Sequence, residues 1–169
     1  LSIRRQRQMC IRDRIYGINH VIGHIAVTQL QFGDVPEDVL ALIVSGGHTS
    51  LLHVNDIAKS IDVVGTTLDD AAGECFDKVA RLLGFPYPGG PHIDRHGRLG
   101  NPNTLKVPQG LTQGRSGKEH PYDFSFSGVK TAVARWVEAR EAQGLEIPVD
   151  DVCACLLYTS PSPRDGLLS

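Results

Sequence analysis

The chain has 169 residues, of which 41% are hydrophobic and 21% are charged, and its formal net charge is −2 at pH 7. This length fits one domain of ordinary size, and this composition is typical of a soluble globular protein. No apolar run approaches the roughly 20 residues of a membrane-spanning helix, and no segment has the pattern of a secretory signal, so we expect neither a membrane protein nor a secreted one.

The two ends differ in character from the rest of the chain. Residues 1–14 contain five arginines and one aspartate, and residues 155–169 form a turn-rich string that interrupts a helical pattern. Both resemble translated adapter sequence at the ends of sequenced fragments, so we expect a non-native leader and tail and exclude them from fold reasoning. The alternative is a genuine basic arm and a disordered tail. Since the leader contributes +4 and the tail zero, residues 15–154 carry −6, which is not the basic footprint of a nucleic-acid-binding domain.

The cysteines exclude two classes of site. They are Cys10, Cys75, Cys153 and Cys155, and no two of them form a Cys-X-X-Cys pair. A zinc ribbon and a thioredoxin-type site are therefore not expected. Free thiols without a secretion signal fit a reducing compartment, and we predict a cytoplasmic protein.

A helix with paired histidines is expected after a short apolar segment at 15–18, which we interpret as the end of a strand. The helix should run from Asn19 to about Phe32, and His20 and His24 then lie on one face. This is the simplest way to offer two nitrogen ligands to one metal ion, although histidines that cap a helix or hydrogen-bond in a core are an equally good interpretation. A third protein ligand has no evident candidate.

A glycine turn is predicted between two apolar strands at 39–44 and 50–54. Its residues are Ser45, Gly46 and Gly47. Because glycine has no Cβ, the backbone can adopt positive φ, and a ligand can approach its N–H groups closely. Such a turn can form a nest for phosphate oxygens, but an ordinary Gly-Gly hairpin is the simpler interpretation of this stretch alone.

A strand at 61–66 and a helix from Thr67 to Gly84 are expected next. Thr67 is the predicted N-cap, and Asp69 and Asp70 suit the positive end of the helix dipole. Asp77 could project from the helix toward a ligand, or it could be a solvated charge paired with Arg81.

A second glycine turn opens a helix at 91–99, where backbone N–H groups can bind an anion or hydroxyls. Asp94 lies one turn into this helix and could accept a hydrogen bond from a ligand hydroxyl. His92 and His96 are interpreted as surface residues, because Arg95 and Arg98 flank them and would repel a cation. Residues 100–122 are expected to form a surface loop. They should precede a strand at 123–126, a helix from Ser127 and a last helix that begins at 149–154.

Five segments in register resemble one known family. They are His20-Val-Ile-Gly-His24, Val44-Ser-Gly-Gly-His-Thr49, Asp69-Asp-Ala-Ala-Gly-Glu-Cys-Phe-Asp-Lys78, Tyr87-Pro-Gly-Gly-Pro91 and Asp123-Phe-Ser-Phe-Ser-Gly-Val-Lys-Thr131. Together they resemble the tRNA N6-adenosine threonylcarbamoyltransferase family, formerly called O-sialoglycoprotein endopeptidase or glycoprotease. The resemblance covers residues 15–154 in the order and spacing of the family.

The resemblance implies an actin-like, Hsp70-like or sugar-kinase-like α/β fold with two lobes around a nucleotide cleft. It implies an iron or zinc ion on His20 and His24. It also implies a site for threonylcarbamoyl-adenylate or ATP at Ile43, Val44, Ser45, Gly46, Gly47, Asp77, Gly90 and Asp94. The acyl group would pass to N6 of adenosine 37 in tRNAs that read ANN codons. In bacteria an inactive paralogue and a small ATPase would be the protein partners.

Two departures from the family pattern limit these expectations. The N-terminal phosphate loop is absent, and so are a C-terminal asparagine segment and the aspartate that supplies the third metal ligand. We therefore expect the middle part of a family member, which binds metal poorly on its own, and we assign activity to the parent protein.

Three alternatives stay open. A metal-dependent peptidase is disfavoured because Val21 occupies the glutamate position of the motif His-Glu-X-X-His. A sugar kinase or chaperone ATPase of the same fold would lack the paired histidines. A scaffolding paralogue would have lost them.

Overall fold

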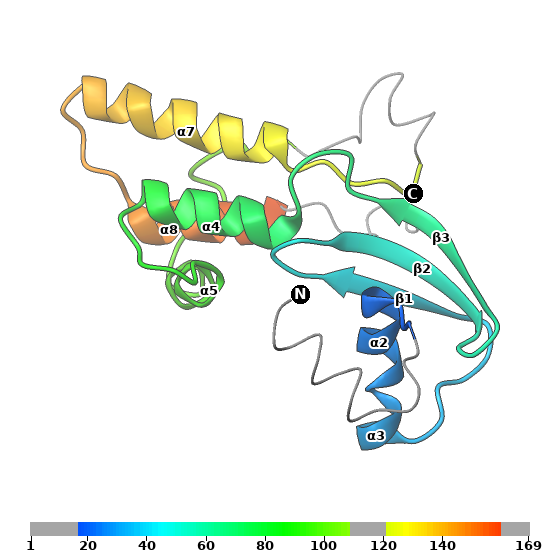
Figure 1. Ribbon diagram of the computed structural model, residues 1–169. Helices are drawn as coiled ribbons and strands as arrows, with labels where there is room; N and C mark the ends of the chain where they lie inside the picture. Colours follow the sequence, from blue (N-terminus) through cyan, green and yellow to red (C-terminus); the bar gives the residue numbers. More distant parts are fainter. Residues whose placement is uncertain (1–16, 109–120, 160–169) are drawn as a thin grey trace, which may run out of the picture.

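The computed structural model describes residues 17–108 and 121–159. A three-stranded sheet with helix α2 against it lies beside a group of helices formed by α4, α5, α7 and α8 (Figure 1). The elements are α2 (His20–Ala26), α3 (Gln29–Phe32), β1 (Val39–Val44), β2 (Thr49–Asp56), β3 (Ser60–Thr66), α4 (Ala72–Leu82), α5 (Gly90–Gly97), α7 (Ser127–Ala142) and α8 (Val149–Thr159). The prediction of a mixed α/β chain is confirmed. Within the described ranges, none of the helices combines the length and hydropathy that a membrane span requires.

The sheet is antiparallel with strand order β1-β2-β3. Strand β1 pairs with β2 from Val39 opposite Val54 to Val44 opposite Thr49, so a four-residue turn joins them. The apolar runs on both sides of the glycines form these strands, and in β1 burial alternates between intermediate and exposed because successive side chains point to opposite faces of the sheet. The predicted hairpin and the predicted third strand are both confirmed.

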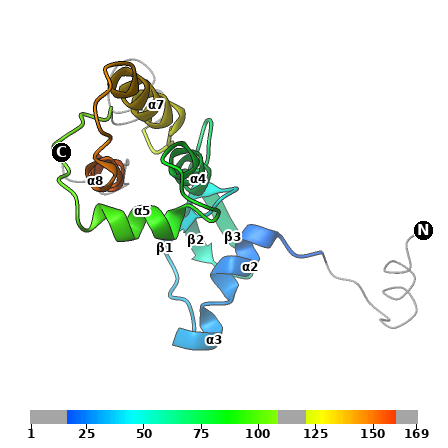
Figure 2. The same cartoon turned by 90° about the vertical axis from the view of Figure 1, so that its left-hand side faces the viewer.

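Two apolar clusters hold the elements in place. In the smaller one, Ile25 of α2 packs on Leu52 and Val54 of β2, which fixes the histidine helix against one face of the sheet. The larger one joins the four other helices, which Figure 1 shows at the end of the sheet where β1 turns into β2 and Figure 2 shows grouped together, apart from α2. Its fully buried members include Val79, Ile93, Val133 and Cys153.

The start of α4 differs from the prediction. The helix begins at Ala72, five residues after Thr67, and its N-cap Ala71 makes no side-chain capping bond. The Thr67 hydroxyl donates instead to the Asp70 carbonyl oxygen at 2.7 Å, which closes a turn before the helix. Thr67 is therefore not the N-cap, and the pattern that suggested a helix start belongs to this turn.

Four smaller expectations also differ. The described residues 17–19 form no strand, and the first helix is interrupted at residues 27–28 between α2 and α3. The strand expected at 123–126 is reduced to a single bridge between Thr67 and Phe124. Helix α8 continues to Thr159, and Cys155 and Leu156 are fully buried, so the helix is not interrupted at the expected start of the tail. Part of the loop at 100–122 lies outside the described residues.

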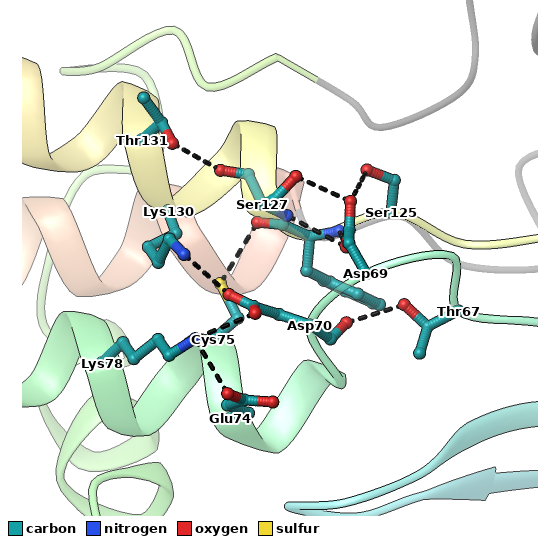
Figure 3. A network of polar contacts seen from close by, with 11 residues as sticks. Thr67, Asp69, Asp70, Glu74, Cys75, Lys78, Ser125, Ser127, Lys130 and Thr131 are labelled. Carbon is teal, nitrogen blue, oxygen red and sulfur yellow. Dashed lines mark hydrogen bonds and ion pairs between the residues drawn. The ribbon is translucent and has the colours of Figure 1, made fainter.

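Asp69 connects the turn before α4 to the beginning of α7 (Figure 3). Its carboxylate accepts from the hydroxyls of Ser125 and Ser127, each at 2.6 Å, and from the backbone N–H groups of Phe126 at 2.8 Å and Ser127 at 3.2 Å. The first N–H groups of a helix have no intrahelical acceptor. Asp69 therefore caps α7 from a distant part of the sequence.

Acid is expected to weaken this cap. Partial burial raises the pKa of Asp69, but the hydrogen bonds from Ser125, Ser127 and the two N–H groups outweigh it, so the pKa lies below its ordinary value. The stabilisation is thus complete above the unfolded pKa of about 3.9 and is lost as pH falls through the folded pKa. In urea unfolding followed by fluorescence of Trp136, the advantage of wild type over Asp69→Asn should shrink below pH ~4. An advantage that is constant with pH would contradict this role.

Candidate functional site

Helix α2 presents its two histidines to solvent. Asn19 caps the helix, with Oδ1 accepting from the N–H groups of Val21 at 2.9 Å and Ile22 at 3.3 Å. Ile25 is buried against the sheet, so the opposite face of α2 is exposed to solvent. His20 and His24 lie on that outer face, so the prediction that one face carries both imidazoles is confirmed.

The spacing of the two rings suits a metal ion. Their Nε2 atoms lie 3.2 Å apart. An ion held about 2.0–2.1 Å from two nitrogens at a tetrahedral angle requires a nitrogen–nitrogen distance of about 3.3 Å. The same distance also suits a hydrogen bond between two neutral rings in opposite tautomers. Among the described residues, no group of three or more His, Cys, Asp or Glu side chains could hold a metal, so a third ligand is not found there.

The turn between β1 and β2 is ordered by Ser45. Its N–H donates to the His48 carbonyl oxygen at 2.8 Å, and its Oγ accepts from the N–H groups of His48 at 2.9 Å and Gly47 at 3.3 Å. The expected positive φ is not found at Gly46 or Gly47. Two of the N–H groups that a phosphate nest would use therefore point at Ser45, because the serine hydroxyl competes for them.

The two glycines nevertheless keep one side of the turn open. A Cβ at Gly46 or Gly47 would meet nothing within 4 Å, so a ligand can approach the backbone from this side. Of the two strand residues that the resemblance adds, Ile43 packs in the cluster beneath α2, whereas the Val44 side chain is exposed.

The structure brings the turn and the paired histidines together. The ring of His48 lies 6.4 Å from the ring of His20, measured between centroids. Because His20 and His48 lie far apart in the sequence, their proximity could not be predicted from it. The one available signal was the position of His48 directly after the two glycines. His48 was not among the predicted site residues.

The remaining predicted residues lie around the start of α5. Asp77 points from α4 to the second glycine turn, where its Oδ1 accepts from the Gly89 N–H at 2.7 Å. None of the ion pairs within the described ranges joins Asp77 to Arg81, so that alternative is not supported. Gly90 is the first residue of α5, and Asp94 pairs with Arg98 at 2.9 Å. Asp77 and Gly90 thus lie at the same glycine turn, and Asp94 follows one helical turn later in α5.

The interpretation of His92 and His96 as plain surface residues is wrong. His96 Nδ1 lies 2.6 Å from Asp150 Oδ1, and its side chain is only 33% exposed. Both imidazoles lie against the Phe85 ring, with centroids 5.4 Å away for His92 and 4.7 Å for His96. His96 joins α5 to the start of α8, whereas His92 packs only on Phe85, and neither belongs to the histidine pair on α2.

Comparison with known proteins gives a consistent result. A family model described as tRNA N6-adenosine threonylcarbamoyltransferase (TsaD) matches residues 9–160. The protein of that name from Bifidobacterium adolescentis is 82% identical over 142 residues, which are 84% of this chain and 41% of that protein. The one from Bifidobacterium longum has the same identity and coverage. The one from Corynebacterium diphtheriae is 53% identical over 140 residues, which are 82% of this chain and 40% of that protein.

The chain thus spans about two fifths of the length of these curated relatives. The family model nevertheless covers most of the chain, including both histidines, the turn of β1 and β2, and the start of α5. The chain belongs to the tRNA N6-adenosine threonylcarbamoyltransferase family.

Proposed function

We propose that the full-length protein transfers a threonylcarbamoyl group from threonylcarbamoyl-adenylate to N6 of adenosine 37 in tRNAs that read ANN codons. The family match supports this activity. The observation in the structure that carries it is the histidine pair, with Nε2 atoms 3.2 Å apart, beside an open glycine turn. In the reaction a bond forms between N6 and the carbonyl carbon, the bond from that carbon to the adenylate oxygen breaks, a proton leaves N6, and AMP is released.

His20 and His24 are proposed to hold one divalent ion, iron or zinc. Such an ion would bind the threonyl carboxylate and polarise the carbonyl group that is attacked. The imidazoles have the donor chemistry that both metals accept, and their spacing fits. The third protein ligand is proposed to come from a part of the protein outside this chain.

The adenylate is proposed to bind across the turn and the start of α5. Ile43, Val44, Ser45, Gly46 and Gly47 would line the side near the phosphate, where the two glycines leave the backbone open. Asp77, Gly90 and Asp94 would lie at the ribose. Because Asp77 Oδ1 is bound to the Gly89 N–H, a ribose hydroxyl would donate to its other oxygen, Oδ2.

The wider architecture and setting are also proposals. The antiparallel β1-β2-β3 sheet with a glycine turn fits one lobe of an actin-like, Hsp70-like or sugar-kinase-like fold. The full-length protein would act in the cytoplasm on tRNA, together with an inactive paralogue and a small ATPase. Since residues 15–154 are acidic, the tRNA would be bound mainly by other parts of the protein or by these partners.

A chimera tests the function. The 142-residue stretch of the Bifidobacterium adolescentis protein that matches this chain would be replaced by the residues of this chain that align with it. With threonylcarbamoyl-adenylate and tRNA, the chimera should form the modified adenosine, measured by mass spectrometry of digested tRNA, and a chelator should stop the reaction. The unmodified relative is the control. A chimera that binds metal but forms no modified adenosine, while the relative does, would refute the assignment.

A further inference from the structure

The glycine turn has a second side, and helix α4 lies against it. The N–H of Gly73 donates to the Ser45 carbonyl oxygen at 3.1 Å. A Cβ at Gly73 would lie 2.7 Å from that oxygen and 2.8 Å from the Gly46 nitrogen, which is closer than real Cβ atoms approach. The contact thus exists only because residue 73 has no side chain.

The backbone conformation does not explain this glycine. Gly73 is the second residue of α4 and does not have a positive φ. Glycine destabilises a helix by about 1 kcal/mol relative to alanine, so its helical position alone would favour another residue. The close approach to the turn is therefore the physical reason for glycine at this position.

Thr49 makes a second connection between the same two elements. It is the buried polar residue at the start of β2, with 2% exposure, and its Oγ1 accepts from the Ala72 N–H at 2.9 Å. Two N–H groups at the beginning of α4 therefore donate to the hairpin, one to Thr49 and one to Ser45. They replace the side-chain cap that Ala71 does not provide.

The same helix also holds the second group of predicted ligand residues. Asp77, which binds the Gly89 N–H, follows Gly73 by four residues, so the two attachments are about 6 Å apart along the helix axis. A rigid helix therefore sets the separation of the turn from the loop before α5.

We propose that Gly73 and Thr49 are positioning residues, through which α4 fixes the Ser45–Gly47 turn at the distance from the start of α5 that an adenylate requires. Gly73 contacts the turn through the Ser45 carbonyl oxygen, Thr49 contacts α4 through Ala72, and neither is proposed to touch the ligand. This inference rests on the proposed function, because it assumes that the turn and the start of α5 bind one nucleotide.

Four variants of the chimera test the proposal, with AMP as the probe. Gly73→Ala should raise the AMP dissociation constant about tenfold or more, since small misplacements of binding groups have effects up to about 100-fold. Thr49→Val, which removes the acceptor, should do the same, and Thr49→Ser, which keeps it, should restore binding. Gly128→Ala is the matched control, because Gly128 is also the second residue of a helix and a Cβ there meets nothing within 4 Å.

The readouts separate positioning from stability. Calorimetry gives the AMP dissociation constant, zinc titration shows whether His20 and His24 still bind, and thermal melting reports stability. We expect weaker AMP binding with unchanged zinc binding and a higher KM for threonylcarbamoyl-adenylate. Lower melting temperatures with unchanged AMP binding would overturn the proposal, and if Gly73→Ala fails to fold, the Thr49 pair decides it. A parent chimera that binds no AMP would refute the proposed nucleotide site itself, and this inference with it.

Discussion

Replacing His20 and His24 together by alanine should abolish metal binding and reduce formation of the modified adenosine by more than about 100-fold. Even residues that only support a metal ligand change metal affinity by roughly 10–100-fold, and these two are the proposed ligands themselves. A distance of 3.2 Å between their Nε2 atoms would let both nitrogens bind one ion, so either single replacement should remove most of the affinity. The measurements are metal content by mass spectrometry and tRNA modification, both on the full-length chimera.

His53→Ala is the matched control for this loss. His53 lies on β2, the strand against which α2 packs, and its Nε2 pairs with Asp38 at 2.7 Å. An exposed pair of this kind contributes little to stability, so the control should bind metal and modify tRNA as wild type does. If the double variant keeps one equivalent of metal, the ion is held elsewhere and the assignment of His20 and His24 is wrong.

Local patterns in the sequence were sufficient to predict part of this site. The i, i+4 spacing places both histidines on one helical face whatever the rest of the fold does, and the apolar runs on both sides of Ser45-Gly46-Gly47 predict a hairpin. Gly84 has φ of 83° and follows α4, as a glycine at a helix end should. Each of these features depends on residues within a few positions of one another.

Contacts between distant residues were not predictable in this way. Asp69 was predicted to lie in the first turn of a helix, but its carboxylate accepts hydrogen bonds from Ser127, 58 positions later. Nothing in the sequence around Gly73 indicates that Ser45 lies against it, and His48 approaches His20 because α2 packs on β2. A capping pattern indicates that the N–H groups at the start of a helix need acceptors, but tertiary packing determines which residues provide those acceptors.

The largest loss of stability is expected from Asp70→Ala. The Asp70 side chain is 17% exposed and lies between two ammonium groups, with Lys78 Nζ and Lys130 Nζ each 2.9 Å from a carboxylate oxygen (Figure 3). Hydrogen bonds from the two lysines hold the pKa of this carboxyl below its usual range, so it is charged near neutral pH. Because it joins α4 to α7, its loss should lower the free energy of unfolding by about 2–3 kcal/mol.

Glu74→Ala separates this effect from a general loss of negative charge. Glu74 pairs with the same Lys78 at 2.8 Å, but its side chain is 45% exposed, and it lies on α4 together with its partner. Removing it should change the free energy of unfolding by less than about 0.5 kcal/mol, as for other exposed pairs within a helix. Urea unfolding followed by fluorescence of Trp136 on α7 measures both variants. Equal losses would mean that charge, rather than the connection between α4 and α7, determines the stability. A loss confined to Asp70→Ala would show that the ion pair of Asp70 with Lys130 helps to hold α4 and α7 together.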